Sequence, residues 1–218
     1  MGKAIREFDL DAPTLPRHLR SEFRYQTRSL TSLYERCFGT KLSVGKAWKI
    51  LIELVPSITF PRHRDLLGAL VIQIVQAPNE LLEINDDLRK NELALTWLVE
   101  GVLKFAAELG LERSPFLEAA DQVRALGFQN IQSWMKPRLN MNGNLSAFVV
   151  VDHDVREARL IGRIVDAKGS VVCESLLAIT RPNEFIFAPM LGSLQWTDHR
   201  TVELRSKDGK ESWSFQAP

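Results

Sequence analysis

The 218-residue sequence lacks the short motifs with which common enzyme families hold phosphates, nucleophiles or zinc. It contains neither a glycine-rich phosphate loop nor Gly-x-Ser-x-Gly, and neither His-Glu-x-x-His nor paired Cys-x-x-Cys. Because these absences together weigh against catalysis, we expect a protein that works by binding. We expect it to need no cofactor and no metal.

Cysteine and long apolar runs are also scarce. The two cysteines, Cys37 and Cys173, lie far apart in the sequence, which favours reduced thiols and a cytoplasmic location. No stretch approaches the roughly 20 apolar residues that cross a bilayer, and the N-terminus does not resemble a secretory signal. We therefore expect no membrane partner.

The composition is that of a globular protein, with 45% hydrophobic and 25% charged residues. The net charge is only +1, but charge is unevenly distributed. Residues 1–64 hold 12 Lys and Arg against 6 Asp and Glu, whereas residues 76–127 hold 5 against 10. Such asymmetry is either ordinary surface variation or a face meant for a charged partner.

Helical periodicity predicts a first helix from about Pro16 to Phe38, with Thr14 as its cap and Gly39 at its end. Four arginines share the side of this helix opposite its apolar arc: Arg17, Arg20, Arg24 and Arg28. Guanidinium groups in such a stripe can bind phosphates or carboxylates bidentately, although a solvated face paired with acids is the simpler interpretation.

The middle of the chain combines two apolar runs with two helices. The β-branched residues of 48–55 and 67–75 favour strands, while the second run is also long enough for a buried helix. A long helix is expected from Asp86 to Leu109, ended by Gly110. A shorter one should follow, with Ser114 as its cap.

From Leu145 onward the pattern is one of strands and turns. Turns at 166–169 and 207–210 predict hairpins, the second of which would set Val202 and Leu204 against Trp213 and Phe215. The expected strands are 146–152, 159–166, 171–177, 185–187, 201–205 and 212–215. The predicted fold is therefore a single α+β domain with a C-terminal antiparallel sheet. The alternative is a division into a mainly helical region, residues 1–138, and a β region, residues 145–218.

The most suggestive binding residues are acids that precede and open the long helix. They favour the helix dipole, and they would also form a negative patch that attracts a basic partner. We add Trp97 as an interface anchor, because the helical wheel places it outside the main apolar arc. The candidate partner-binding residues are Glu80, Glu83, Asp86, Asp87, Glu92 and Trp97.

Two alternatives remain open. The first is a binder of nucleic acid or phosphate that uses the arginine stripe, although no aromatic residues are interleaved with it, which makes nucleic acid the weaker choice. The second is an enzyme that uses Asp152, His153 or His199. Alternation along a strand points Asp152 and His153 to opposite faces, so a solvated turn explains this segment better.

One family resemblance can be stated from the residues. In layout the chain resembles immunity proteins of bacterial polymorphic-toxin and contact-dependent inhibition systems. The segments that carry the likeness are residues 95–111, a helix containing Phe116, and residues 130–134, 185–196 and 202–204. The resemblance implies a cytoplasmic inhibitor that binds one cognate toxin domain and occludes its active site. The arginine-striped helix has no counterpart in that layout.

Overall fold

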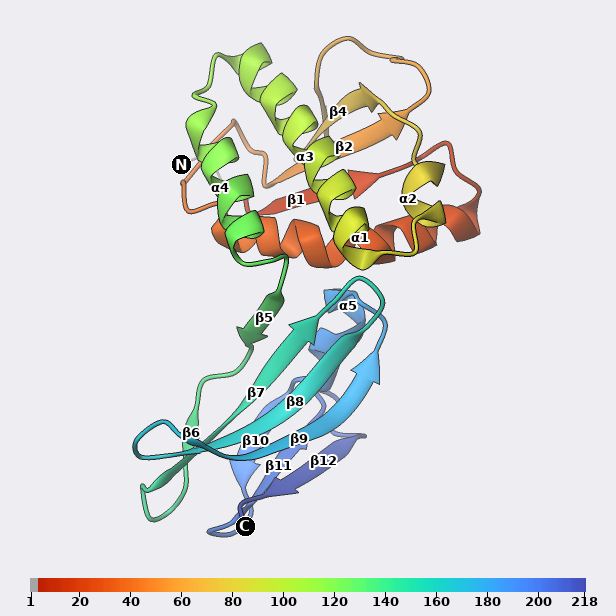
Figure 1. The fold of residues 1–218 in the computed structure, drawn as a ribbon. Coiled ribbons are helices and arrows are strands. Elements are labelled where there is room, and N and C mark those ends of the chain that lie inside the picture. The colour runs from red at the N-terminus through yellow and green to blue at the C-terminus, as the bar shows by residue number, and fades with distance from the viewer. Residues whose placement is uncertain (1–3) are drawn as a thin grey trace. The chain divides into compact units, whose positions relative to one another are not determined.

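The computed structural model describes residues 4–218. The chain forms two compact units, of which the first ends at Gln129 and the second is Asn130–Pro218 (Figure 1). Each unit has a hydrophobic cluster of its own. The boundary between them precedes the division at residues 138–145 that the sequence suggested as an alternative to one domain.

The first unit is built on a four-stranded sheet, with the order β1-β2-β4-β3. Its strands are β1 (Glu7–Asp11), β2 (Lys49–Val55), β3 (Arg64–Leu66) and β4 (Ala69–Val75). The strands β1, β2 and β4 are parallel, and β3 joins β4 as an antiparallel hairpin. Strand alternation sends Phe8, Ile50 and Ile72 into the core, whereas the opposite face carries Asp9 and Lys49 together with the apolar Val71.

Helices cover the apolar face of this sheet (Figure 1). They are α1 (Arg17–Cys37), α2 (Asn79–Glu83), α3 (Asp87–Leu109) and α4 (Ser114–Ala125). Helix α3 approaches the sheet closely at Gly101, where a Cβ atom would lie 2.5 Å from a side-chain carbon of Ile52. A glycine at this position therefore brings α3 directly against β2.

The elements predicted for the first unit are largely confirmed. The two apolar runs form β2 and β4, and the helices form at the expected places. The predicted caps are wrong: Pro16 precedes the first turn of α1 with no side-chain cap, and Ser114 is the first residue of α4 rather than its cap. Strand β1 was not predicted, because three of its five residues are acids, which obscure the apolar alternation.

The second unit contains two antiparallel sheets. One holds β5 (Asn130–Ser133), β6 (Arg138–Leu139), β7 (Leu145–His153), β8 (Ala158–Asp166) and β9 (Val171–Thr180). The other holds β10 (Ser193–Trp196), β11 (Thr201–Arg205) and β12 (Ser212–Gln216). The inward residues of both sheets and Phe187 form one core.

The expected α+β class with a C-terminal antiparallel sheet of hairpins is confirmed. Val202 pairs with Phe215 and Leu204 with Trp213, as the alternation predicted. The strand expected at 185–187 is wrong, because α5 (Glu184–Phe187) and a 3-10 turn (η1, Ala188–Met190) form there instead. Asn183 starts this helix by accepting a hydrogen bond from the Phe185 amide.

Candidate functional site

Most of the acids singled out in the sequence surround one hollow in the first unit, which we call the acidic hollow. Its volume is about 950 Å³. Glu80 and Glu83 reach it from α2, and Asp86 and Glu92 from the start of α3. Its other lining residues are Ile84, Asn85, Leu88, Arg89, Leu93 and Thr96.

Local structure fixes the positions of these carboxylates. The short helix α2 is anchored by Leu81, which is fully buried, so Glu80 and Glu83 face outward. Asp86 caps α3 by accepting a 2.8 Å hydrogen bond from the Arg89 amide. The acids therefore belong to ordered helix ends, and the capping role of Asp86 uses one carboxylate oxygen.

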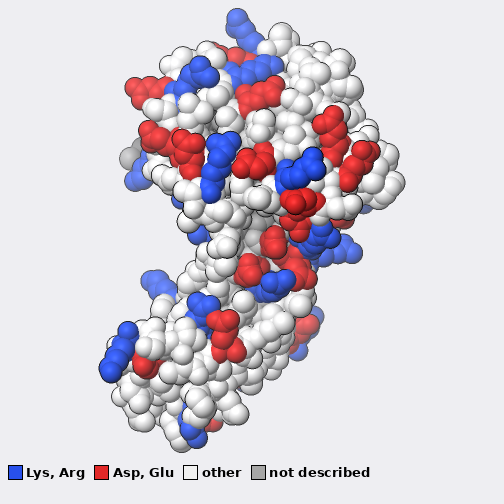
Figure 2. Space-filling model, in the orientation of Figure 1, with Lys and Arg blue, Asp and Glu red and all other residues white. Residues whose placement is uncertain are grey.

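The acidic hollow has a surplus of negative charge. Four carboxylates and one guanidinium, that of Arg89, line it. Glu92 also pairs with Arg124 across 3.5 Å, but both side chains are nearly half exposed, so solvent weakens this pair. Figure 2 shows acidic side chains gathered over α2 and the start of α3. Asp87, the remaining acid of the predicted set, is half-buried and does not line the hollow.

The prediction that Trp97 is a surface anchor is wrong. Its side chain is only 1% exposed, and it stacks on Phe23 of α1 with ring centroids 6.4 Å apart. The helical wheel was misleading because α3 is covered on two sides, by the sheet and by α1. The apolar periodicity of a single helix does not predict that a second side of it is buried by another helix.

A second hollow, which was not predicted, lies at the start of α2 and is lined there by Asn79. Its volume is about 730 Å³, and it sits where β2 and β4 end and α1 begins. Its walls are mainly apolar and include Leu15, Leu19, Pro56, Val75 and Pro78. The ends of parallel strands are common ligand positions, but the sequence did not reveal that β2 and β4 are parallel.

The arginine stripe of α1 faces carboxylates of the same unit. Arg20 binds both carboxylate oxygens of Asp11, which is buried in the β1 edge. Arg28 pairs with Glu35, further along the same helix, with a 2.9 Å contact. The exposed Arg17 appears in no ion pair that the structure describes among residues 4–218. Paired guanidiniums have less capacity for an external anion.

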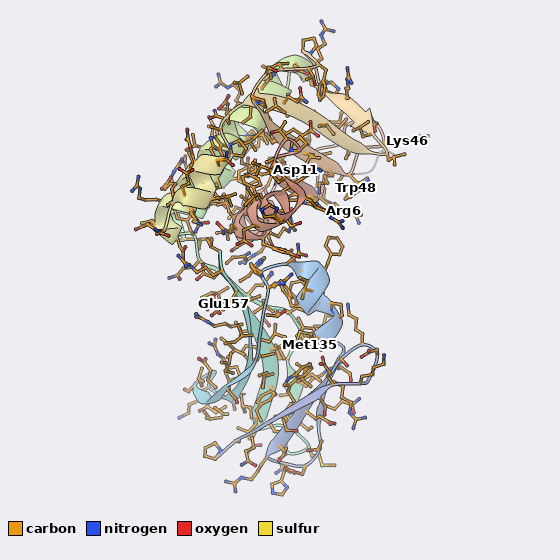
Figure 3. The ribbon with its side chains drawn as sticks, turned by 90° about the vertical axis from the view of Figure 1, so that its right-hand side faces the viewer. Arg6, Asp11, Lys46, Trp48, Met135 and Glu157 are labelled. Atoms are coloured by element: carbon orange, nitrogen blue, oxygen red, sulfur yellow. The ribbon has the colours of Figure 1, made fainter. Side chains whose placement is uncertain are left out.

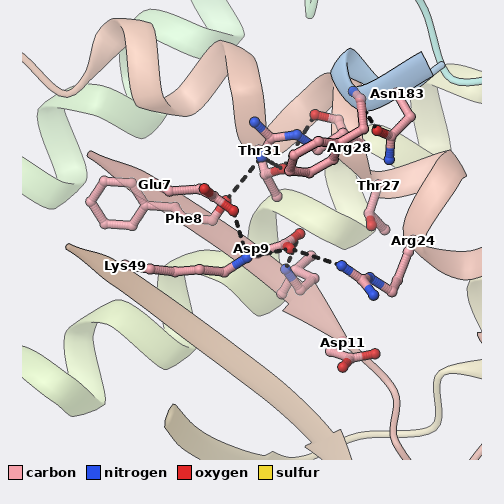
Figure 4. A network of polar contacts seen from close by, with 12 residues as sticks. Glu7, Phe8, Asp9, Asp11, Arg24, Thr27, Arg28, Thr31, Lys49 and Asn183 are labelled. Carbon is pink, nitrogen blue, oxygen red and sulfur yellow. Dashed lines mark hydrogen bonds and ion pairs between the residues drawn. The ribbon is translucent and has the colours of Figure 1, made fainter. Parts of the chain in front are cut away.

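Asp9 is the centre of this polar network (Figure 4). It accepts from Lys49 at 2.8 Å and lies 3.7 Å from Arg24, while Glu7 contacts the same ammonium group. Burial lowers the pKa of Lys49, but the neighbouring carboxylates of Asp9 and Glu7 outweigh it and raise the pKa above its ordinary value. The network thus holds β1, β2 and α1 together at a sheet edge.

The groups considered for catalysis do not converge. His153 is buried at the end of β7, with its Nδ1 4.0 Å from Glu184 and its ring edge-on to Phe187. The expected solvated turn is therefore wrong for His153. Asp152 is on the opposite face of β7 and pairs with Arg159 at 3.5 Å, whereas His199 is exposed in a turn.

Three further observations bear on identity. Among residues 4–218, no group of three or more His, Cys, Asp or Glu is arranged to hold a metal ion. In the same range, every helix is too short or too polar to cross a bilayer. No protein-family model matches the chain, and neither a curated protein nor a solved structure is significantly similar to it.

Proposed function

We propose that this protein binds a basic protein surface through the acidic hollow. The observation that carries the proposal is the convergence of Glu80, Glu83, Asp86 and Glu92 around one hollow that contains a single guanidinium. Acids that served only the dipole of α3 would cluster at its first turn, whereas two of these four lie on α2. A partner presenting Lys or Arg would find carboxylates on several sides.

A protein partner fits this surface better than a small cation. The acidic hollow and the apolar hollow both include residues of α2, since Asn79 lines the apolar hollow and its neighbour Glu80 lines the acidic one. Interfaces combine charge, which speeds encounter, with apolar anchors that slow dissociation. A folded partner that places a cation in one hollow and an apolar side chain in the other would use both.

Within this class, we propose a cytoplasmic immunity protein that neutralises a cognate toxin domain by occluding its active site. The support is the resemblance in sequence layout together with a surface suited to a basic partner. Enzymes that cleave nucleic acid bind phosphates through basic sites, and a carboxylate-lined hollow would compete for such side chains. Neutralisation would then need no chemistry from the inhibitor.

The proposal is tested with the product of the gene next to this one as the probe. We expect the two purified proteins to associate, the association rate to fall as salt rises, and the neighbour's toxicity to be suppressed. The charge-reversing pair Glu80→Lys and Glu83→Lys should weaken binding at least tenfold. The matched pair Glu112→Lys and Glu118→Lys, at exposed acids outside the hollow, should leave it within twofold.

Two results would contradict the proposal. One is that the protein encoded by the adjacent gene is neither bound nor neutralised. The other is that the double variant in the hollow and the matched double variant outside it lose binding equally, since that would indicate a general effect of net charge. Failure of the toxin assay with binding intact would leave a protein-binding module and remove only the immunity role.

The arginine stripe remains a weaker candidate for binding nucleic acid. Three of its four guanidiniums face Asp11, Asp9 or Glu35. An external phosphate would have to displace these carboxylates, so we expect no binding to DNA or RNA at low salt. Steeply salt-dependent binding that Arg17→Ala abolishes would reverse this preference.

A further inference from the structure

The β3–β4 hairpin presents exposed aliphatic side chains that no packing requirement explains. Leu66 is 56% exposed and Leu67 100% exposed. Leu66 pairs with Ala69, so Leu67 and Gly68 form the two-residue turn between the strands. Their φ angles are +55° and +88°, the left-handed pair that such tight hairpin turns require.

Leucine is a costly choice at this position. Two-residue turns of this kind favour Asn followed by Gly, because a Cβ is strained at positive φ and a branched apolar side chain gains nothing there. The chain has one other described non-glycine residue with positive φ, Phe128, whose ring packs against the core of the first unit. Burial offsets the strain at Phe128, whereas Leu67 has no burial to offset it.

The turn is flanked by an indole and by cations. The Trp48 ring lies against Gly68, where a Cβ would come within 2.8 Å of Trp48 Cδ1, and this indole is 38% exposed. The Arg6 amide donates to the Trp48 carbonyl oxygen. Figure 3 shows Arg6, Lys46 and Trp48 close together at one edge of the first unit. Both cations are exposed and enter no ion pair in the described residues of the chain.

We propose that this tip, made of Leu66, Leu67 and Trp48 with Arg6 and Lys46 beside it, docks onto a bilayer surface that carries anionic headgroups. Aliphatic side chains enter the acyl boundary, tryptophan lies at the level of the headgroups, and cations pair with the lipid phosphates. A bilayer accepts a protruding leucine without a shaped pocket. The charge of the tip matches anionic lipid, since Asp65 is the only acid in the hairpin.

Other partners fit this tip less well than a bilayer surface does. A symmetric contact with a second copy of the chain would bring Arg6 and Lys46 close to their own equivalents. A nucleic acid would stack bases on an open aromatic face, but the Trp48 side chain is only 38% exposed and the leading residues of the tip are leucines. This proposal departs from the expectation of no membrane partner, which rested on the lack of a spanning segment, because a surface contact needs no such segment.

Vesicle sedimentation with the full chain tests the proposal. The probes are vesicles of phosphatidylcholine alone and of equal parts phosphatidylcholine and phosphatidylglycerol. We expect weak, reversible pelleting with the mixed vesicles only, decreasing as salt rises. Leu67→Asn, which suits the turn, should lower the partition coefficient about tenfold. Met141→Asn, at an 88% exposed residue of the second unit, should leave it unchanged.

A second measurement locates the contact. Lipids with brominated acyl chains should quench a fraction of the tryptophan fluorescence of the wild type, and Trp48→Phe should remove that fraction. Absence of pelleting, equal pelleting of Leu67→Asn and wild type, or quenching that survives in Trp48→Phe would each overturn the proposal. So would Leu67-dependent binding of a labelled oligonucleotide in place of vesicles, which would mark the tip as a nucleic-acid surface.

Discussion

The two units of this chain stabilise themselves by different means. The first buries large aliphatic and aromatic residues between helices and a parallel sheet, and ties the sheet edge to α1 with carboxylates, guanidiniums and Lys49. The second packs two antiparallel sheets around a smaller core that includes Phe187 and the buried His153. The second unit has ion pairs as well, such as Arg163 with Glu174, but that pair is more exposed than the pair of Lys49 with Asp9 in the first unit.

This difference also separates the candidate surfaces. The acidic hollow, the apolar hollow and the Leu67 tip all lie in the first unit. The second unit exposes apolar residues along β9, among them Leu176 and Ile179. Substitutions in each unit can show whether the two units unfold separately or together.

The largest expected effect is in the core of the second unit. Phe187 is fully buried, with its ring 5.2 Å from Trp134 and 5.4 Å from His153. Phe187→Ala leaves a cavity and should cost about 4 kcal/mol. Hydrogen exchange followed by mass spectrometry should show lost protection in Asn130–Pro218 alone. Phe185→Ala, at an 85% exposed neighbour, should change stability by less than about 0.5 kcal/mol. Equal loss of protection in both units would show that they unfold together.

The next effect is in the first unit, at the contact between α3 and β2. Gly101→Val would force a branched side chain against Ile52, whose carbons lie 2.5–2.7 Å from the Cβ position. We expect a loss of about 3 kcal/mol in denaturant unfolding of the first unit. Ala107→Val changes an exposed position of the same helix. It should lower stability only slightly, because valine has a lower helix propensity than alanine. Similar losses in the two variants would contradict direct packing of α3 on the sheet.

Sequence reasoning succeeded where structure is set locally. Periodicity and terminal glycine identified α3, and alternation with turn residues identified the β11–β12 pairing to the correct register. Periodicity failed at β1, because three acids among its five residues obscure the apolar alternation. Sequence reasoning found four acids of the hollow as a charge cluster, but Trp97 shows that a helical wheel cannot reveal a second layer of packing.

A third prediction tests the charge network that distinguishes the first unit. Lys49→Met should cost about 2 kcal/mol at neutral pH, because Asp9 would keep its burial and lose its closest cation. The pKa of Lys49 is raised in the folded state, so its contribution is complete below its ordinary pKa and is lost as pH rises through the raised value. Stability measured across alkaline pH should therefore fall more in the wild type than in Lys49→Met. Lys41→Met, at an exposed lysine, should follow the wild type.

The smallest expected effect is a gain in stability rather than a loss. It is found by comparing substitutions at Leu67 and Phe128, the two described non-glycine residues with positive φ. Leu67→Asn should raise the stability of the first unit by about 1 kcal/mol, because asparagine accepts the left-handed conformation and no buried contact is lost. Phe128→Asn gains the same backbone relief but removes a ring that packs on the core, so the net change should be a loss. Thermal unfolding of both variants measures the contrast. A stabilised Leu67→Asn that no longer pellets with anionic vesicles would show that the strain at the tip serves binding. A destabilised one would show that Leu67 supports the hairpin, and the strain argument for a lipid surface would then fail.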